Sequence, residues 1–119
     1  MLKVNLQEKL AMFSEFWSPR IVGELNGQQV KLAKLKGEFV PHHHENEDEL
    51  FLVLKGKLEI RFPDKVAVLR EGEFIIVPRG VEHQPVAEEE AHVLLLEPVG
   101  TLNTGNVRSD RTVESPERI

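Results

Sequence analysis

The segment PHHHENEDEL, residues 41–50, contains the side chains with the clearest capacity for chemistry. Three adjacent histidines are followed by four carboxylates within five positions. In an extended strand, residues i and i+2 point to the same face, so His42 and His44 would lie side by side while His43 points the opposite way. Two imidazoles on one face begin a site for a metal such as Zn, Fe, Mn, Ni or Cu.

Two further residues have the type and position to complete such a site. Glu49 opens the apolar run LFLVL and shares strand parity with Phe51 and Val53, whereas the other three carboxylates of the segment fall in a polar connection and are expected to be solvated. His83, in VPRGVEHQPV, follows a Pro-x-Gly turn that would start a strand toward the same cavity. On spacing alone two interpretations stay open: a metal site, or a solvated loop with surface histidines.

Composition narrows the class of protein. A chain of 119 residues with 40% hydrophobic residues predicts one domain, residues 1–119. The net charge of −5 and the scattered lysines argue against a nucleic-acid partner. Cysteine is absent, so any metal would have nitrogen and oxygen ligands. No apolar run reaches the length of a signal peptide or a membrane span, and we therefore expect a cytoplasmic protein without a membrane partner.

Hydrophobic periodicity predicts one helix followed by strands. Asn5 can cap a helix over about residues 5–13. Short β-branched and apolar runs follow, separated by turn signals such as Asn26-Gly27, Lys36-Gly37 and Glu71-Gly72, and there are no helical crossovers. This pattern indicates an all-β antiparallel sandwich or barrel over about residues 20–97. The tail, residues 98–119, is either an ordered arm over the barrel or a loose end.

Two runs around the candidate ligands resemble the motifs of the cupin superfamily. GEFVPHHHENEDELFLVLKG, residues 37–56, contains His-x-His, four residues, Glu, six residues and Gly; GEFIIVPRGVEH, residues 72–83, reads Gly, five residues, Pro, one residue, Gly, two residues and His. Ala87 stands where the family often has Asn, and Gly37 is one residue closer to the first histidine than usual. The chain is similar to small single-domain cupins of the mannose-6-phosphate isomerase-like group. That resemblance implies a double-stranded β-helix, or jelly-roll barrel, with a short N-terminal helix, and a divalent metal held by His42, His44, Glu49 and His83.

The function implied by this resemblance divides into two main classes. One is a metal-dependent enzyme, such as a dioxygenase acting on a chelating substrate or an isomerase. The other is a non-catalytic module that binds or senses a small molecule, with a structural metal or none. We expect the cavity to be lined by residues such as Phe51, Val53 and Ile76, and the run AEEEA, residues 87–91, to be a solvated turn. The short apolar strand RIVGEL offers a free sheet edge, so we expect a homodimer.

Overall fold

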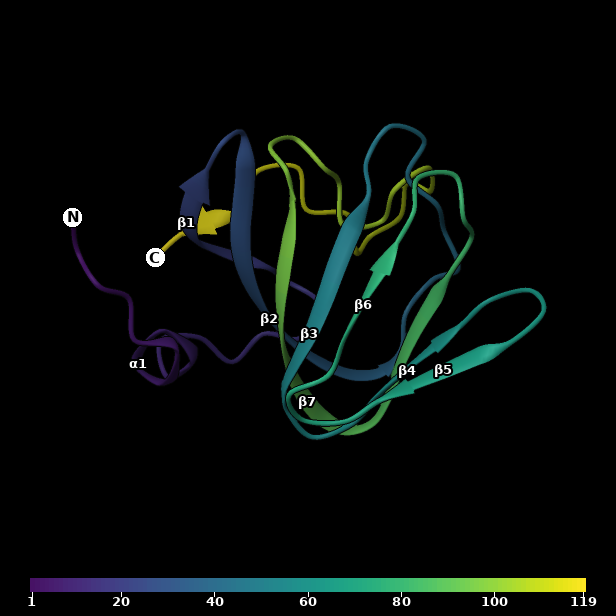
Figure 1. The fold of residues 1–119 in the computed structure, drawn as a ribbon, viewed down its shortest axis with the longest axis horizontal. Helices are drawn as coiled ribbons and strands as arrows, with labels where there is room; N and C mark the ends of the chain where they lie inside the picture. Colours follow the sequence, from purple (N-terminus) through teal and green to yellow (C-terminus); the bar gives the residue numbers. More distant parts are fainter.

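The computed structural model describes residues 1–119 and consists of one short helix followed by eight strands (Figure 1). This all-β barrel with a short N-terminal helix confirms the predicted fold class. The elements are α1 (Leu6–Leu10), β1 (Arg20–Leu25), β2 (Gln28–Glu38), β3 (Glu49–Lys55), β4 (Leu58–Arg61), β5 (Val66–Leu69), β6 (Phe74–Val77), β7 (Gln84–Pro98) and β8 (Glu117–Arg118). No helix is long and apolar enough to cross a membrane.

Strand β7 organises the barrel because it pairs along both of its edges. One edge runs antiparallel to β2 over nearly the full length of both strands. The other edge is shared: β4 pairs with the beginning of β7, and β3 pairs with its later part. Strands β5 and β6 extend the sheet beyond β4 and β3. The sheet therefore curls over itself and encloses an interior (Figure 1).

Alternating residues of these strands fill the interior. The main core comprises twelve buried residues, and it includes Ala33 and Leu35 of β2, Phe51 and Val53 of β3, and Val93 of β7. The intervening residues face outward, as the two-residue period of a strand requires. Inward parity in β3 thus extends from Val53 through Phe51 to Glu49, as the sequence predicts, and places a carboxylate in the interior.

The helix is shorter than predicted and covers part of the outer face. Asn5 caps it as expected, its Oδ1 accepting from the Glu8 N–H at 3.0 Å. The helix ends at Leu10 rather than near residue 13 because the Met12 N–H bonds three residues back, to the Lys9 carbonyl at 3.1 Å. Leu10 and Phe13 pack on Leu32 in a second, smaller cluster outside the barrel. Residues before the helix project away from the barrel (Figure 1).

The C-terminal tail is an ordered arm, which settles the alternative that the sequence left open. It crosses the barrel, and its last residues form β8, parallel to the start of β1. The Ile119 N–H donates to the Ile21 carbonyl at 3.0 Å. The edge of β1 that was expected to be free is therefore covered at Arg20 and Ile21 by the chain's own end.

Three local predictions were wrong. Lys36-Gly37 is not a turn; it lies inside β2 at a register shift, where Gly37 adopts φ +87°. Residues 87–91 are solvated at their glutamates but belong to β7, as a bulged stretch opposite that shift. Ile76 does not line the interior and is 54% exposed. In the pairing of β6 with β3, Ile76 lies opposite the outward Leu50, whereas Val77 lies opposite the inward Glu49.

Candidate metal site

His42 and His83 are brought together by the backbone. The two residues form an isolated antiparallel bridge, with the His42 N–H donating to the His83 carbonyl at 3.0 Å and the His83 N–H donating to the His42 carbonyl at 2.8 Å. Each imidazole Nδ1 also lies 2.9 Å from a carbonyl two residues earlier, that of Val40 or Val81. With Nδ1 as the donor in each contact, both Nε2 atoms remain available as ligands.

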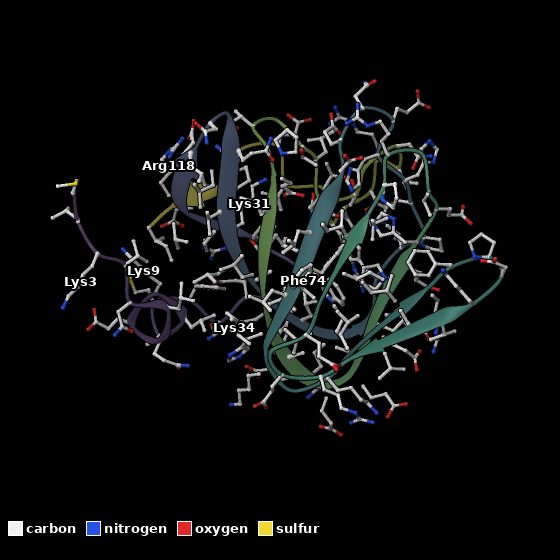
Figure 2. The ribbon with its side chains drawn as sticks, in the orientation of Figure 1. Lys3, Lys9, Lys31, Lys34, Phe74 and Arg118 are labelled. Atoms are coloured by element: carbon white, nitrogen blue, oxygen red, sulfur yellow. The ribbon has the colours of Figure 1, made fainter.

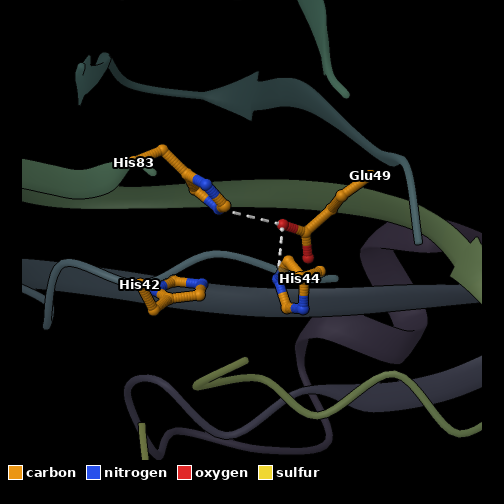
Figure 3. A group of neighbouring side chains, drawn as sticks. All are labelled: His42, His44, Glu49 and His83. Carbon is orange, nitrogen blue, oxygen red and sulfur yellow. Dashed lines mark ion pairs between the residues drawn. The ribbon is translucent and has the colours of Figure 1, made fainter. Parts of the chain in front are cut away.

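His44 and Glu49 complete the arrangement. His44 lies in the connection before β3, and Glu49 is the first residue of β3. Glu49 Oε1 lies 3.3 Å from Nε2 of His44 and 3.3 Å from Nε2 of His83 (Figure 3). The side chains of His42, His44, Glu49 and His83, here called the His/Glu cluster, converge on one point (Figure 3). Each contributes one potential ligand atom, and these atoms all lie within 4.8 Å of one another.

The His/Glu cluster is almost completely shielded from solvent, with exposed fractions of 3%, 4%, 3% and 0% in chain order. Both ring nitrogens of His44, His83 Nε2 and Glu49 Oε1 are buried without a hydrogen-bond partner. Buried polar atoms are normally paired, because an unpaired one loses its hydration without compensation. Four such atoms in one cluster of imidazoles and a carboxylate fit a divalent transition metal, whose preferred ligands include these groups.

The protonation states of two members suit metal ligation. Burial, with a smaller contribution from His83, lowers the pKa of His42 to about 4, so that its imidazole is neutral near pH 7. Burial alone would raise the pKa of Glu49, but its contacts with Glu97, His44 and His83 outweigh burial and hold that pKa well below its ordinary value. Neutral imidazole and ionised carboxylate are the forms that bind metals.

A buried ion pair behind Glu49 was not singled out in the sequence. Lys31 of β2, labelled in Figure 2, and Glu97 of β7 are only 2% and 1% exposed, and their Nζ and Oε1 atoms lie 2.8 Å apart. Burial and the adjacent Glu49 raise the pKa of Glu97 well above its ordinary value, and Lys31 offsets only part of that shift. The sequence offered one indication, because Lys31 falls on the same strand face as Ala33 and Leu35, which point inward. A lysine in a strand usually points to solvent, however, so the residue type favoured an exposed side chain.

The neighbouring histidines and acidic residues lie outside the His/Glu cluster. His43 points away from the cluster, and its Nε2 lies 3.3 Å from Oε1 of the exposed Glu45. Asp48 is also exposed, and its Oδ1 accepts a hydrogen bond from the backbone N–H of Arg79 at 2.9 Å. His92 Nε2 lies 2.6 Å from Glu90 Oε2, and His92 does not belong to the His/Glu cluster. The structure therefore brings together the four predicted ligands and separates them from their polar neighbours.

A cavity adjoins the His/Glu cluster inside the barrel. His42 and Glu49 form part of its wall. The remaining lining is mostly apolar, from Trp17 near the N-terminal segment to Leu95 of β7.

Comparison with known proteins agrees with this architecture. A family model described as the cupin domain (Cupin_2) matches residues 28–98, more than half of the chain. Protein YdbB of Bacillus subtilis is 41% identical over 81 residues, which make up 67% of this chain and 66% of YdbB. The match thus spans slightly less than two thirds of that relative.

Two solved structures are similar over most of their length. A cupin-2 domain containing protein from Shewanella frigidimarina is 44% identical, with a TM-score of 0.79, covering 80% of this chain and 93% of the other. Protein NMB1881 from Neisseria meningitidis is 33% identical, with a TM-score of 0.75, covering 82% of this chain and 99% of the other. Both similarities extend over the barrel that carries the His/Glu cluster.

Proposed function

The chain belongs to the cupin family, and from this premise we propose that it binds one divalent transition metal through His42, His44, Glu49 and His83. The observation that carries the proposal is that four buried side chains converge, and that His44, Glu49 and His83 among them hold buried ligand atoms without a hydrogen-bond partner. Fe, Mn, Ni, Zn and Cu all accept three imidazoles and one carboxylate, so the ligand types do not choose among these ions.

The chain's own residues would prepare the site in two ways. The carbonyls of Val40 and Val81 fix the rings of His42 and His83 through Nδ1, which directs Nε2 toward the shared point. The low pKa of His42 keeps that ring free of a competing proton. A bound metal would supply Lewis-acid or redox chemistry at the inner end of the cavity.

We further propose that a small molecule occupies the cavity beside the metal. A metal-dependent enzyme, such as a dioxygenase or an isomerase, and a non-catalytic binding or sensing module both fit this arrangement. One observation favours the second class: apart from His42 and Glu49, the cavity lining contains no titratable side chain to act as a general acid or base. Any catalysis would then depend on the metal itself.

The metal site is tested by calorimetric titration of the metal-free protein with Zn²⁺ and Mn²⁺. We expect one ion per chain for the wild type and a loss of affinity of at least about 100-fold for His42→Ala or His83→Ala, since second-shell changes alone cost 10–100-fold. His43→Ala is the matched control, because it removes an adjacent histidine that faces away. Unchanged binding in both ligand variants, or loss of binding in the control alone, would contradict the proposal.

A further inference from the structure

The cavity wall contains three aromatic rings and several aliphatic side chains. Trp17 and Phe39 are stacked, with ring centroids 4.6 Å apart and planes inclined by 15°. Phe51, Leu35 and Leu95 continue the lining from the buried core of the barrel. No lysine or arginine lines the cavity, so a phosphate or sulfate group inside it would have no cationic side chain to pair with.

The few polar side chains of the wall are already engaged. Asn103 donates through Nδ2 to the carbonyls of Arg111 at 2.9 Å and Trp17 at 3.4 Å, and its Oδ1 accepts from the Val113 N–H at 2.8 Å. The Trp17 indole N–H donates to the Lys36 carbonyl at 2.9 Å. The wall therefore reserves no polar side chain for a ligand, apart from the two members of the His/Glu cluster.

This distribution discriminates between ligand classes. A sugar carries hydroxyl groups around its ring, and each hydroxyl that enters an apolar cavity without a partner loses its hydrogen bonds to water. An apolar ring or branched chain gains from the same walls through burial and aromatic contacts. Only one end of the cavity, at His42 and Glu49, offers polar ligand atoms, so the polar group of the ligand must lie there.

From these contacts we propose that the cavity takes a small molecule with a metal-chelating oxygen group at one end and an uncharged, apolar body at the other. Sugars and sugar phosphates are excluded by the same lining. This inference rests on the proposed metal site, since the chelating group needs the ion, and it adds the chemical class of the ligand.

The test compares two probes that share a chelating group and differ in their bodies. The Zn²⁺-loaded wild type is titrated with benzohydroxamic acid and acetohydroxamic acid, and with mannose 6-phosphate as a sugar phosphate. We expect the phenyl probe to bind at least tenfold more tightly than the methyl probe, with no binding of mannose 6-phosphate. Equal affinity of the two hydroxamates, or tighter binding of the sugar phosphate, would overturn the inference.

A cavity-filling variant checks where the phenyl group lies. Ala33 is 2% exposed and lines the cavity, so Ala33→Leu should remove the phenyl preference and bring the affinities of the two hydroxamates within twofold of each other. Trp17→Ser, at a partly buried position, offers a second variant and should also reduce the ratio of the two affinities. A phenyl preference that survives in both folded variants would place the ring elsewhere and contradict the inference.

Metal content separates the two proposals. Zn²⁺ bound at one ion per chain without a phenyl preference would contradict the ligand class and leave the metal site standing. Failure of the wild type to retain Zn²⁺ would contradict both.

Discussion

His42 shows at the scale of one residue how burial sets the protonation state of a side chain. Its ring is 3% exposed, and its pKa of about 4 lies well below the ordinary value of 6.5. The folded protein therefore holds this ring neutral, whereas the unfolded chain protonates it readily as the pH falls below 6.5. The same property that keeps Nε2 available to a metal makes the metal-free protein sensitive to acid.

The pH dependence of stability follows from that shift. Between pH 7 and pH 5 the unfolded state binds more protons at His42 than the folded state, so the free energy of unfolding falls, by about 2 kcal/mol from this residue. Chemical denaturation of the chelator-treated protein at both pH values measures the change. His42→Gln should lose less stability on acidification by about that amount, and His43→Gln should behave as the wild type. Equal losses in all three proteins would show that His42 is not the responsible group.

The buried pair of Lys31 and Glu97 is expected to be costly to break. Lys31→Met leaves the Glu97 carboxyl without its cation in an environment closed to water. We expect the free energy of unfolding to fall by about 3 kcal/mol, the typical cost of removing one partner of a buried pair. Lys36→Met, at an exposed position of the same strand, should change it by less than about 0.5 kcal/mol. Urea denaturation measures the free energy of unfolding of both variants. Equal losses in the two variants would contradict the prediction that breaking the buried pair is more destabilising than removing an exposed lysine.

At the scale of the element, the C-terminal arm supports the segment that carries His42 and His44. The Asn106 N–H donates to the His43 carbonyl at 3.0 Å, and Asn106 Oδ1 accepts from the His43 N–H at 2.8 Å. These reciprocal bonds fix the backbone between His42 and His44. The arm is thus part of what holds two histidines at their spacing, although it lies more than fifty residues away in the sequence.

Gly105 of the arm lies tightly against the backbone at His42 and His43. A Cβ added there would lie 2.3 Å from the His43 carbonyl oxygen and 2.9 Å from His42 Cδ2, and φ is +56°. Gly105→Ala should therefore displace the arm, lower the free energy of unfolding by more than about 2 kcal/mol and weaken metal binding. Gly100→Ala is the matched control: φ is +91° and nothing lies within 4 Å, so only the backbone cost of about 1 kcal/mol applies. Thermal unfolding and Zn²⁺ titration of both variants test this, and equal effects would refute the role of the arm.

Strand parity explains which features could be predicted from the sequence. The two-residue period aligned Glu49 with Phe51, because burial alternates along β3. The same period predicted that His42 and His44 point to one side, and it held although both precede β3 and only His42 forms a bridge. The prediction failed for Ile76, whose face depends on its pairing with β3 rather than on its own alternation. Lys36-Gly37 was misread as a turn because a bulge and a turn both use a glycine at positive φ.

Long-range contacts explain what the sequence could not provide. Glu97 meets Glu49 only because β7 pairs with β3, and the Lys31–Glu97 contact depends on the register between β2 and β7. The arm's contact with His43 likewise joins residues without a local signal in either segment. Motif spacing indicated the four residues of the His/Glu cluster, while the groups that surround them depended on tertiary packing.

At the scale of the whole molecule, the outer face of β3 and β6 carries exposed apolar side chains. Phe74, labelled in Figure 2, is 60% exposed and pairs across the strands with Leu52, and Ile76 is 54% exposed and pairs with Leu50. The edge of β1, from which a dimer was expected, is partly covered by β8. The apolar face of β3 and β6 is therefore the better candidate for contact with a second copy of the chain.

We expect a homodimer in solution that depends on this face. The double variant Phe74→Lys/Ile76→Lys should be monomeric, because two lysines on each copy would meet across a symmetric contact. Leu25→Lys is the control, since Leu25 is 52% exposed on β1, away from that face. Sedimentation equilibrium gives the masses. A monomeric wild type, or a double variant that remains dimeric, would contradict the expectation.

The central claim is that the His/Glu cluster is a metal site, and metal content tests it most directly. Elemental mass spectrometry on protein purified without an affinity tag or added chelator gives the ions per chain. We expect close to one equivalent of Fe, Mn, Ni, Zn or Cu, and its loss in His83→Ala. Less than about a tenth of an equivalent, unchanged after incubation with each of these ions, would contradict the claim.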